Sequence, residues 1–163
     1  MDELFNLDFL KRRTESEKLW LCLFFGGTLG WDIGSDPASR SHFVKADISD
    51  SEQVQNMVKA AVDTYGRLDV AVNNAALTPD DKPVAEFDED YWDKLMSIDL
   101  KGTALCLKYE LQQLIKQGEG GSIINISSVS GFRPQPDNVA YVGTAEQTKN
   151  PILTRNLIVL CRI

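Results

Sequence analysis

The stretch LDVAVNNAA, residues 68–76, decides the fold of this chain of 163 residues. Its first five residues are almost wholly apolar, and the run then ends in two asparagines and two alanines. Such a short apolar run that stops at polar residues is typical of a buried strand. Two further runs, LWLCLFF at 19–25 and SIINIS at 122–127, have the same character. Strands that are apolar on both faces indicate a parallel sheet that helices cover on both sides.

Helical segments separate these runs. The segment SDSEQVQNMVKAAVDTYG, residues 49–66, repeats apolar residues at intervals of three and four, which predicts a helix with one apolar face. We expect Ser49 and Glu52 to form its capping box and Gly66 to end it in the left-handed conformation. FVKADIS at 43–49 is predicted as a short strand, and a long helical stretch is expected from about Asp88 to Gln117. Alternating strands and helices predict an α/β fold, a doubly wound parallel sheet.

Composition limits the possible partners. The chain has a formal net charge of -7 and no basic cluster, so we expect no nucleic-acid partner. The run at 19–25 is too short to span a membrane and is predicted as a buried strand rather than a signal or anchor. Because the chain has a single histidine with no cysteine beside it, a metal site is not expected. Three widely spaced cysteines suit buried free thiols and a cytoplasmic location: Cys22, Cys106 and Cys161.

Five motifs follow one another in a fixed order between residues 43 and about 142. They are FVKADIS, NNAA at 73–76, SIDLKGT at 97–103, GSIINISSVSG at 121–131, and Tyr141, which comes thirteen residues after Ser128. In this order they resemble the short-chain dehydrogenase/reductase family. The resemblance implies a Rossmann-like fold, incomplete at both ends, and an NAD(P)-dependent oxidoreductase that acts on a small carbonyl or alcohol substrate. It also implies a homo-oligomer.

The resemblance also implies roles for individual residues. Ser128 would orient the substrate oxygen, Tyr141 would be the acid/base, and Asp99 stands where the family has a catalytic asparagine. On the cofactor side, Asp47 would bind the adenine amino group and Ile48 would pack on the adenine ring. The remaining cofactor residues would be Asn74, Ala75 and Ala76 beside the adenosine ribose and Gly26 and Gly30 in the glycine-rich turn.

Three positions differ from the pattern of the family. The lysine that lowers the pKa of the tyrosine is expected four residues after it, but position 145 is alanine. Lys149, eight residues on, either approaches the phenol through a looped insertion or is a solvated surface lysine. Asp99 cannot donate a hydrogen bond as an asparagine does. Trp31 and Asp32 interrupt the glycine-rich turn. Only sixteen residues separate Gly30 from Asp47, too few for the helix, strand and second helix expected there, and the charged residue that distinguishes NAD from NADP would lie in that missing part. The choice between the two cofactors therefore cannot be predicted.

These differences leave several hypotheses open. The chain is a catalytically impaired oxidoreductase, or a non-catalytic fragment or interaction module of that lineage, or an aberrant translation product. We predict residues 1–42 as a divergent N-terminal segment with a degenerate glycine-rich turn, and residues 43–163 as a partial Rossmann-like domain. The chain is expected to stop inside the tyrosine-bearing helix.

Overall fold

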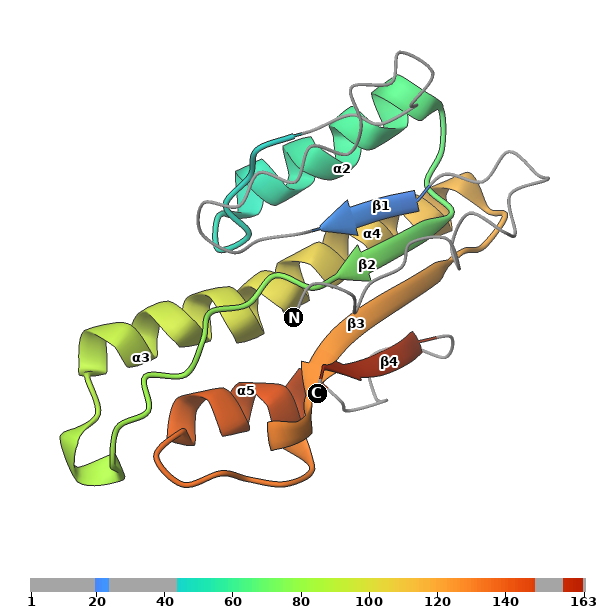
Figure 1. Cartoon of the computed structure of the whole chain (residues 1–163). Helices are drawn as coiled ribbons and strands as arrows, with labels where there is room; N and C mark the ends of the chain where they lie inside the picture. Colours follow the sequence, from blue (N-terminus) through green and yellow to red (C-terminus); the bar gives the residue numbers. More distant parts are fainter. Residues whose placement is uncertain (1–19, 24–43, 149–156, 163) are drawn as a thin grey trace, which may run out of the picture.

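A parallel sheet forms the centre of the molecule. The computed structural model describes residues 20–23, 44–148 and 157–162 (Figure 1). Within them, four strands lie in the order β1-β2-β3-β4, and each neighbouring pair is parallel. The strands are β1 (Trp20–Leu23), β2 (Val70–Asn73), β3 (Ser122–Ser128) and β4 (Leu157–Arg162). The predicted α/β fold with a parallel sheet is confirmed, and the strand predicted at 19–25 is present as β1.

The helices connect the strands as crossovers. They are α2 (Ser51–Tyr65), the continuous run of α3 (Glu89–Leu95), η2 (Met96–Gly102) and α4 (Thr103–Gln117), and α5 (Val139–Thr148). Two short 3-10 turns are η1 (Val84–Glu86) and η3 (Val129–Gly131). Right-handed crossovers between strands that follow one another in a single direction place their helices on the same face of the sheet. The described helices therefore form one covering layer, in which α2 contacts α4 and η2 contacts α5.

Burial along β3 follows this layering. Ile123, Asn125 and Ser127 are buried, whereas Ile124 and Ile126 between them are only half-buried. Successive side chains of a strand point to opposite faces, so the buried set faces the helices. The described helices thus cover one face of the sheet. The core between α2, α4 and the sheet contains Ala46, Ile48, Val54, Met57, Val58, Leu68, Ala71, Cys106, Leu107, Leu114 and Ile123.

The start of α2 differs from the prediction. Asp50 is the N-cap, and its side chain accepts hydrogen bonds from the backbone N–H groups of Glu52 (2.8 Å) and Gln53 (3.1 Å). The capping box at Ser49 and Glu52 is therefore wrong by one residue, because the aspartate carboxylate takes the cap and Ser49 instead donates to Asp47. Gly66 does end the helix with a φ of 87°, as predicted.

The strand predicted at 43–49 is wrong for the described residues 44–49. Ala46 and Ile48 are buried and Lys45 and Asp47 are exposed, so the alternation typical of a strand is present. A strand also needs a neighbour with which to exchange backbone hydrogen bonds. None of the described segments pairs with residues 44–49, and the described sheet consists of β1, β2, β3 and β4.

The chain continues beyond the tyrosine-bearing helix. α5 is described as far as Thr148, and residues 157–162 form β4, which pairs with β3 from Ile123↔Leu157 to Ser128↔Arg162. The expectation that the chain stops inside this helix is wrong. The apolar sequence LIVLC at 157–161 suits a strand next to β3.

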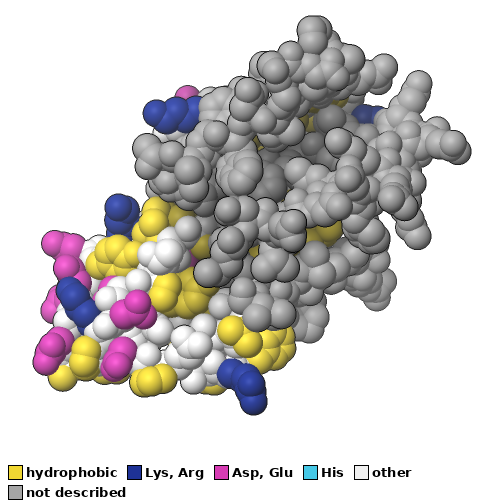
Figure 2. All heavy atoms as spheres, viewed as in Figure 1, with side chains coloured by type: hydrophobic (Ala, Val, Ile, Leu, Met, Phe, Trp, Pro, Cys, Tyr) yellow, Lys and Arg dark blue, Asp and Glu magenta, His cyan; other side chains and the backbone are white. Residues whose placement is uncertain are grey.

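The surface around α3 is acidic. Figure 2 shows Asp and Glu side chains over α3 and the turn that precedes it, with hydrophobic side chains between them. The exposed residues here include Glu86, Asp88, Glu89, Asp90 and Asp93, with Val84 and Phe87. In the part of the chain that the structure describes, none of the helices is both long and apolar enough to cross a membrane.

Candidate active site

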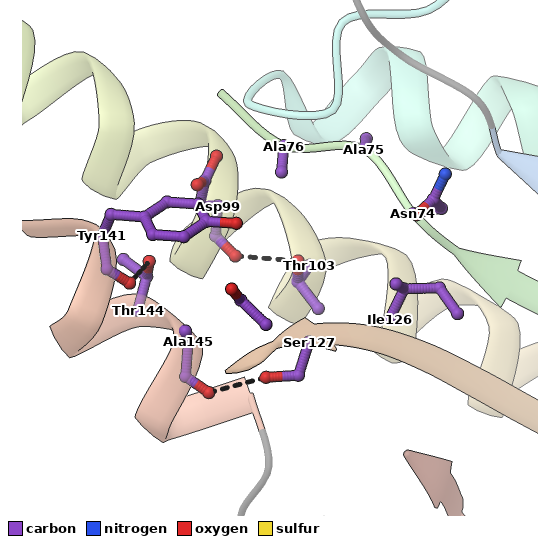
Figure 3. A pocket seen from close by; sticks show the side chains of 11 residues that line it. Asn74, Ala75, Ala76, Asp99, Thr103, Ile126, Ser127, Tyr141, Thr144 and Ala145 are labelled. Carbon is purple, nitrogen blue, oxygen red and sulfur yellow. Dashed lines mark hydrogen bonds between the residues drawn. The ribbon is translucent and has the colours of Figure 1, made fainter. Parts of the chain in front are cut away.

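A pocket lies at the carboxyl ends of β2 and β3, where ligands bind in open α/β sheets (Figure 3). Four segments contribute to it: the residues after β2, the η2–α4 run, the end of β3, and α5. It is lined by Asn74, Ala75, Ala76, Asp99, Thr103, Ile126, Ser127, Ser128, Tyr141, Thr144 and Ala145.

The structure brings the predicted serine and tyrosine into this one pocket. Ser128 is the last residue of β3, is 8% exposed, and its Oγ accepts a hydrogen bond from Ser130 N (3.2 Å). Tyr141 lies in the first turn of α5, and Figure 3 shows its ring directed into the pocket. The twelve residues between them in sequence form η3, the loop that returns the chain to the pocket, and the first two residues of α5.

Helix α5 is held close to the end of β3. Ser127 Oγ donates a hydrogen bond to the backbone oxygen of Ala145 (2.8 Å), and both residues are buried. Gly131 permits this approach, since a Cβ at that position would lie 2.8 Å from the same oxygen. The contact fixes the turn of α5 that carries Tyr141 and Ala145 against the sheet.

Ala145 stands where an ammonium group would be expected. It is 6% exposed, lines the pocket, and lies one helical turn after Tyr141. Among the described residues, neither a lysine nor an arginine lines this pocket. Lys149 lies outside the described residues.

Asp99 places a carboxyl group on the same pocket. It is 7% exposed, and its Oδ1 accepts a hydrogen bond from Leu77 N (2.8 Å), which ties the segment after β2 to η2. Burial raises the pKa of Asp99 to about 6, against a partial lowering by the bond from Leu77. The π-helical turn Met96–Gly102 carries this residue, and such turns are frequent at functional sites.

The segment after β2 forms the opposite wall. Asn74, Ala75 and Ala76 line the pocket, and two of these three side chains are methyl groups that leave the backbone accessible. The tyrosine Tyr91 holds the continuation of this segment, since its hydroxyl donates to Thr78 O (2.6 Å).

The residues predicted to bind adenine lie elsewhere. Ile48 is 4% exposed and belongs to the core, where its Cδ1 would be 2.7 Å from a Cβ at Gly102. The exposed Asp47 accepts from Ser49 N (2.9 Å) and Ser49 Oγ (2.7 Å) in a local turn. Neither lines the pocket, and their contact with adenine stays a prediction. Gly26 and Gly30 lie outside the described residues.

Comparison with known proteins identifies the lineage. The profile described as short chain dehydrogenase matches residues 28–146. The chain belongs to the short-chain dehydrogenase family. "Short chain dehydrogenase/reductase astE" of Aspergillus oryzae is 54% identical over 110 residues, which cover 68% of this chain and 42% of that protein. The predicted family is confirmed, and the match begins before residue 43.

Two solved structures are similar to this chain in fold. NAD+-bound xylitol dehydrogenase has a TM-score of 0.60 and 28% identity, over 62% of this chain and 38% of its own. ElxO with NADP bound has a TM-score of 0.61 and 34% identity, over 64% of this chain and 42% of its own. The chain spans less than half the length of the proteins it matches.

A buried polar cluster beneath the pocket was missed by the sequence analysis of this short-chain dehydrogenase. Glu110 on α4 is 0% exposed, and its Oε2 accepts from Asn73 Nδ2 (3.1 Å). The same Nδ2 donates to Asn125 Oδ1 (2.9 Å). A signal was present, because Glu110 lies midway between the buried residues Cys106 and Leu114 on one helix face.

Proposed function

We propose that this chain is an NAD(P)-dependent oxidoreductase of the short-chain dehydrogenase type whose proton transfer is impaired. The observation that carries the proposal is Ala145. Its buried methyl group lines the pocket one turn after Tyr141, at the place where a cation would lower the pKa of a phenol. The family membership and the Ser128–Tyr141 pair in one pocket support the reaction class.

The described residues fit the nicotinamide end of a dinucleotide. The crevice at the carboxyl ends of β2 and β3 is the usual ligand position in such sheets, and the small side chains of Ala75 and Ala76 leave its wall open. Asn74, Ala75 and Ala76 would line the path of the dinucleotide between its adenosine ribose and this pocket. When bound, the nicotinamide supplies or accepts the hydride at the substrate carbon.

The protein's part of the reaction concerns the substrate oxygen. Ser128 Oγ would orient that oxygen, and the hydroxyl of Tyr141 would donate a proton to it during reduction or take one during oxidation. A phenol titrates near pH 10 in water, so the phenolate needs a stabilising positive charge at neutral pH. Ala145 provides none, and the ionised form of Asp99 in the same pocket disfavours a phenolate.

The second candidate is a non-catalytic module of this family. Two of the positions that differ from the family pattern, Asp99 and Ala145, line the pocket itself. Changes confined to the pocket favour loss of turnover with retention of the fold. Such a module would keep the sheet and bind small molecules weakly.

Cofactor binding and turnover together test the proposal. NADH and NADPH are titrated into the protein by calorimetry, and their oxidation is followed with a panel of small ketones. We expect weak binding and, at high protein concentration, slow turnover that Tyr141→Phe abolishes. Absence of both binding and turnover would favour the module. Micromolar binding with rapid, Tyr141-dependent turnover would overturn the impairment.

We propose a cytoplasmic homo-oligomer that acts on a small carbonyl or alcohol and binds no nucleic acid. The free, buried Cys106 supports the cytoplasmic location, and the net charge of -7 supports the absence of a nucleic-acid partner. Ile115 on α4 is 76% exposed, which supports association. Light scattering after size exclusion measures the assembly, and Ile115→Lys should shift it toward monomer.

A further inference from the structure

A fully buried carboxyl group lies directly below the pocket. Asn73 and Asn125 are register partners on β2 and β3, and both side chains are buried on the face covered by α4. Glu110 reaches this pair from α4 and has no exposed surface. One amide group, Nδ2 of Asn73, donates to both Glu110 Oε2 and Asn125 Oδ1, so a single side chain joins two strands and a helix.

Two oxygens of this cluster have no partner among the described residues. They are Oε1 of Glu110 and Oδ1 of Asn73, and both are buried. A carboxylate only accepts hydrogen bonds, so an ionised Glu110 would leave a buried charge with one donor. A carboxylic acid carries an O–H group, and an acid and a primary amide are complementary, since each offers one donor and one acceptor. A proton on Oε1 would satisfy both unpaired oxygens if it is donated to Oδ1 of Asn73.

The surroundings of Glu110 favour this neutral form. Cys106, one turn earlier on α4, is buried and uncharged, because burial and the nearby Glu110 raise its pKa to about 12. The strands present the neutral Asn73 and Asn125, and Asp99 on η2 is tied to Leu77. Burial raises the pKa of Glu110 itself to about 7, against a partial lowering by the bond from Asn73. The face of α2 toward α4 is apolar, with Val54, Met57, Val58 and Ala61.

The cluster is connected to the pocket through the backbone. Asn73 is the last residue of β2, and the next three residues, 74–76, line the pocket. Asn125 lies two residues before Ser127 on β3, and Ser127 and Ser128 line the facing wall. Holding the two asparagines together therefore fixes the spacing of these two walls.

We propose that Glu110, as a neutral acid, is a positioning residue that locks Asn73 to Asn125 and thereby sets the geometry of the pocket. Ionisation of Glu110 breaks the second bond to Asn73 and loosens both walls. The inference concerns the pocket on which the proposed function rests, but it does not require redox activity. Its test reads the pocket walls directly.

The experiment is hydrogen exchange of backbone amides at several pH values, read by mass spectrometry and corrected for intrinsic exchange. Residues 74–77 and 127–130 are followed in the intact chain and in Glu110→Gln. In the unaltered chain we expect exchange of these segments to increase about tenfold between pH 6 and pH 8.5, since opening should follow ionisation. Glu110→Gln should keep the segments as protected at pH 8.5 as at pH 6, because glutamine supplies the same donor and acceptor without titrating.

The controls separate positioning from general stability. Glu52→Gln makes the same change on the exposed surface of α2 and should retain the pH dependence of the unaltered chain. Selective 13C labelling of glutamate carboxyls should show one resonance that titrates near pH 7 and disappears in Glu110→Gln. A Glu110 carboxyl that is ionised at pH 5.5, or walls whose exchange does not change with pH, would overturn the proposal. Failure of NADH or NADPH to bind would overturn only the proposed reaction.

Discussion

Two buried carboxyl groups on one continuous helical run, Asp99 and Glu110, have different environments. Asp99 borders the pocket and accepts a backbone N–H from Leu77, whereas Glu110 faces the sheet and is bonded to the side chain of Asn73. Burial raises the pKa of both groups, to about 6 and about 7. At neutral pH the group at the pocket is therefore more ionised than Glu110.

The difference shows how one helix serves two purposes. A π-helical turn directs Asp99 into the pocket, and the regular α-helix that follows directs Glu110 toward the strands. Charge at the first position affects any reaction at Tyr141. Charge at the second affects the spacing of the strand ends.

Removal of the Glu110 side chain should have the largest effect on stability. Glu110→Ala leaves a cavity and deletes a hydrogen bond to Asn73, so we expect a loss of about 2–4 kcal/mol in the free energy of unfolding. Urea denaturation at pH 6 measures it. Glu52→Ala, on the exposed face of α2, should cost less than about 0.5 kcal/mol. Equal losses in the two variants would show that Glu110 is not part of the packed core.

The stability of the folded chain should depend on pH in a defined direction. The pKa rises from 4.5 to about 7 for Glu110 and from 3.8 to about 6 for Asp99, so the folded chain binds more protons than the unfolded chain between these values. The stabilisation that these two groups contribute should therefore be fully present below about pH 4, decrease as pH rises, and be lost above about pH 8. Each group should contribute at most about 3 kcal/mol.

Urea denaturation between pH 4 and pH 8.5 follows this dependence. Glu110→Gln should remove the decrease in unfolding free energy that occurs near pH 7. Asp99→Asn should remove the decrease that occurs near pH 6. A pH dependence of stability that is the same in both variants as in the unaltered chain would contradict the assignment of both groups.

The contact between α5 and β3 can be tested with a pair of glycines. Gly131→Ala places a Cβ 2.8 Å from the backbone oxygen of Ala145, so we expect a loss of roughly 1–3 kcal/mol in unfolding free energy. Gly143 lies in α5, the helix of Ala145, and a Cβ added there would have nothing within 4 Å. Gly143→Ala should therefore stabilise the fold by roughly 0.5–1 kcal/mol. Thermal unfolding of both variants gives the comparison. Equal effects would contradict the close approach of α5.

Introducing a lysine beside Tyr141 should increase turnover only slightly. Ala145→Lys places an amine one turn after Tyr141, but it leaves the cofactor turn and Asp99 unchanged, so we expect at most about a threefold increase in ketone reduction. Ala145→Lys combined with Asp99→Asn should exceed either single change, because it supplies the cation and removes the opposing carboxylate. A large gain from Ala145→Lys alone would mean that cofactor binding is better than proposed.

Much of the fold followed from sequence because the strands are apolar and their helices have clear ends at Gly66 and Gly118. The strand expected at 43–49 was predicted wrongly, because a strand needs a neighbouring strand as well as alternating apolar and polar residues. Pairing of Ser128 with Tyr141 in one pocket was predictable from their interval. The contact of Ser127 with Ala145 was not, since it depends on how closely Gly131 lets α5 approach. Glu110 was overlooked because a lone acid on an apolar face carries no motif.

We propose that the pocket, as far as the described residues form it, keeps Ser128 and Tyr141 without the cation that the proton transfer needs. The most direct test of this claim is the rate of NADPH and NADH oxidation with small ketones at neutral pH, compared between the unaltered chain and Tyr141→Phe. We predict a rate only slightly above that of Tyr141→Phe, with weak cofactor binding in both. Rapid oxidation that disappears in Tyr141→Phe would contradict the claim.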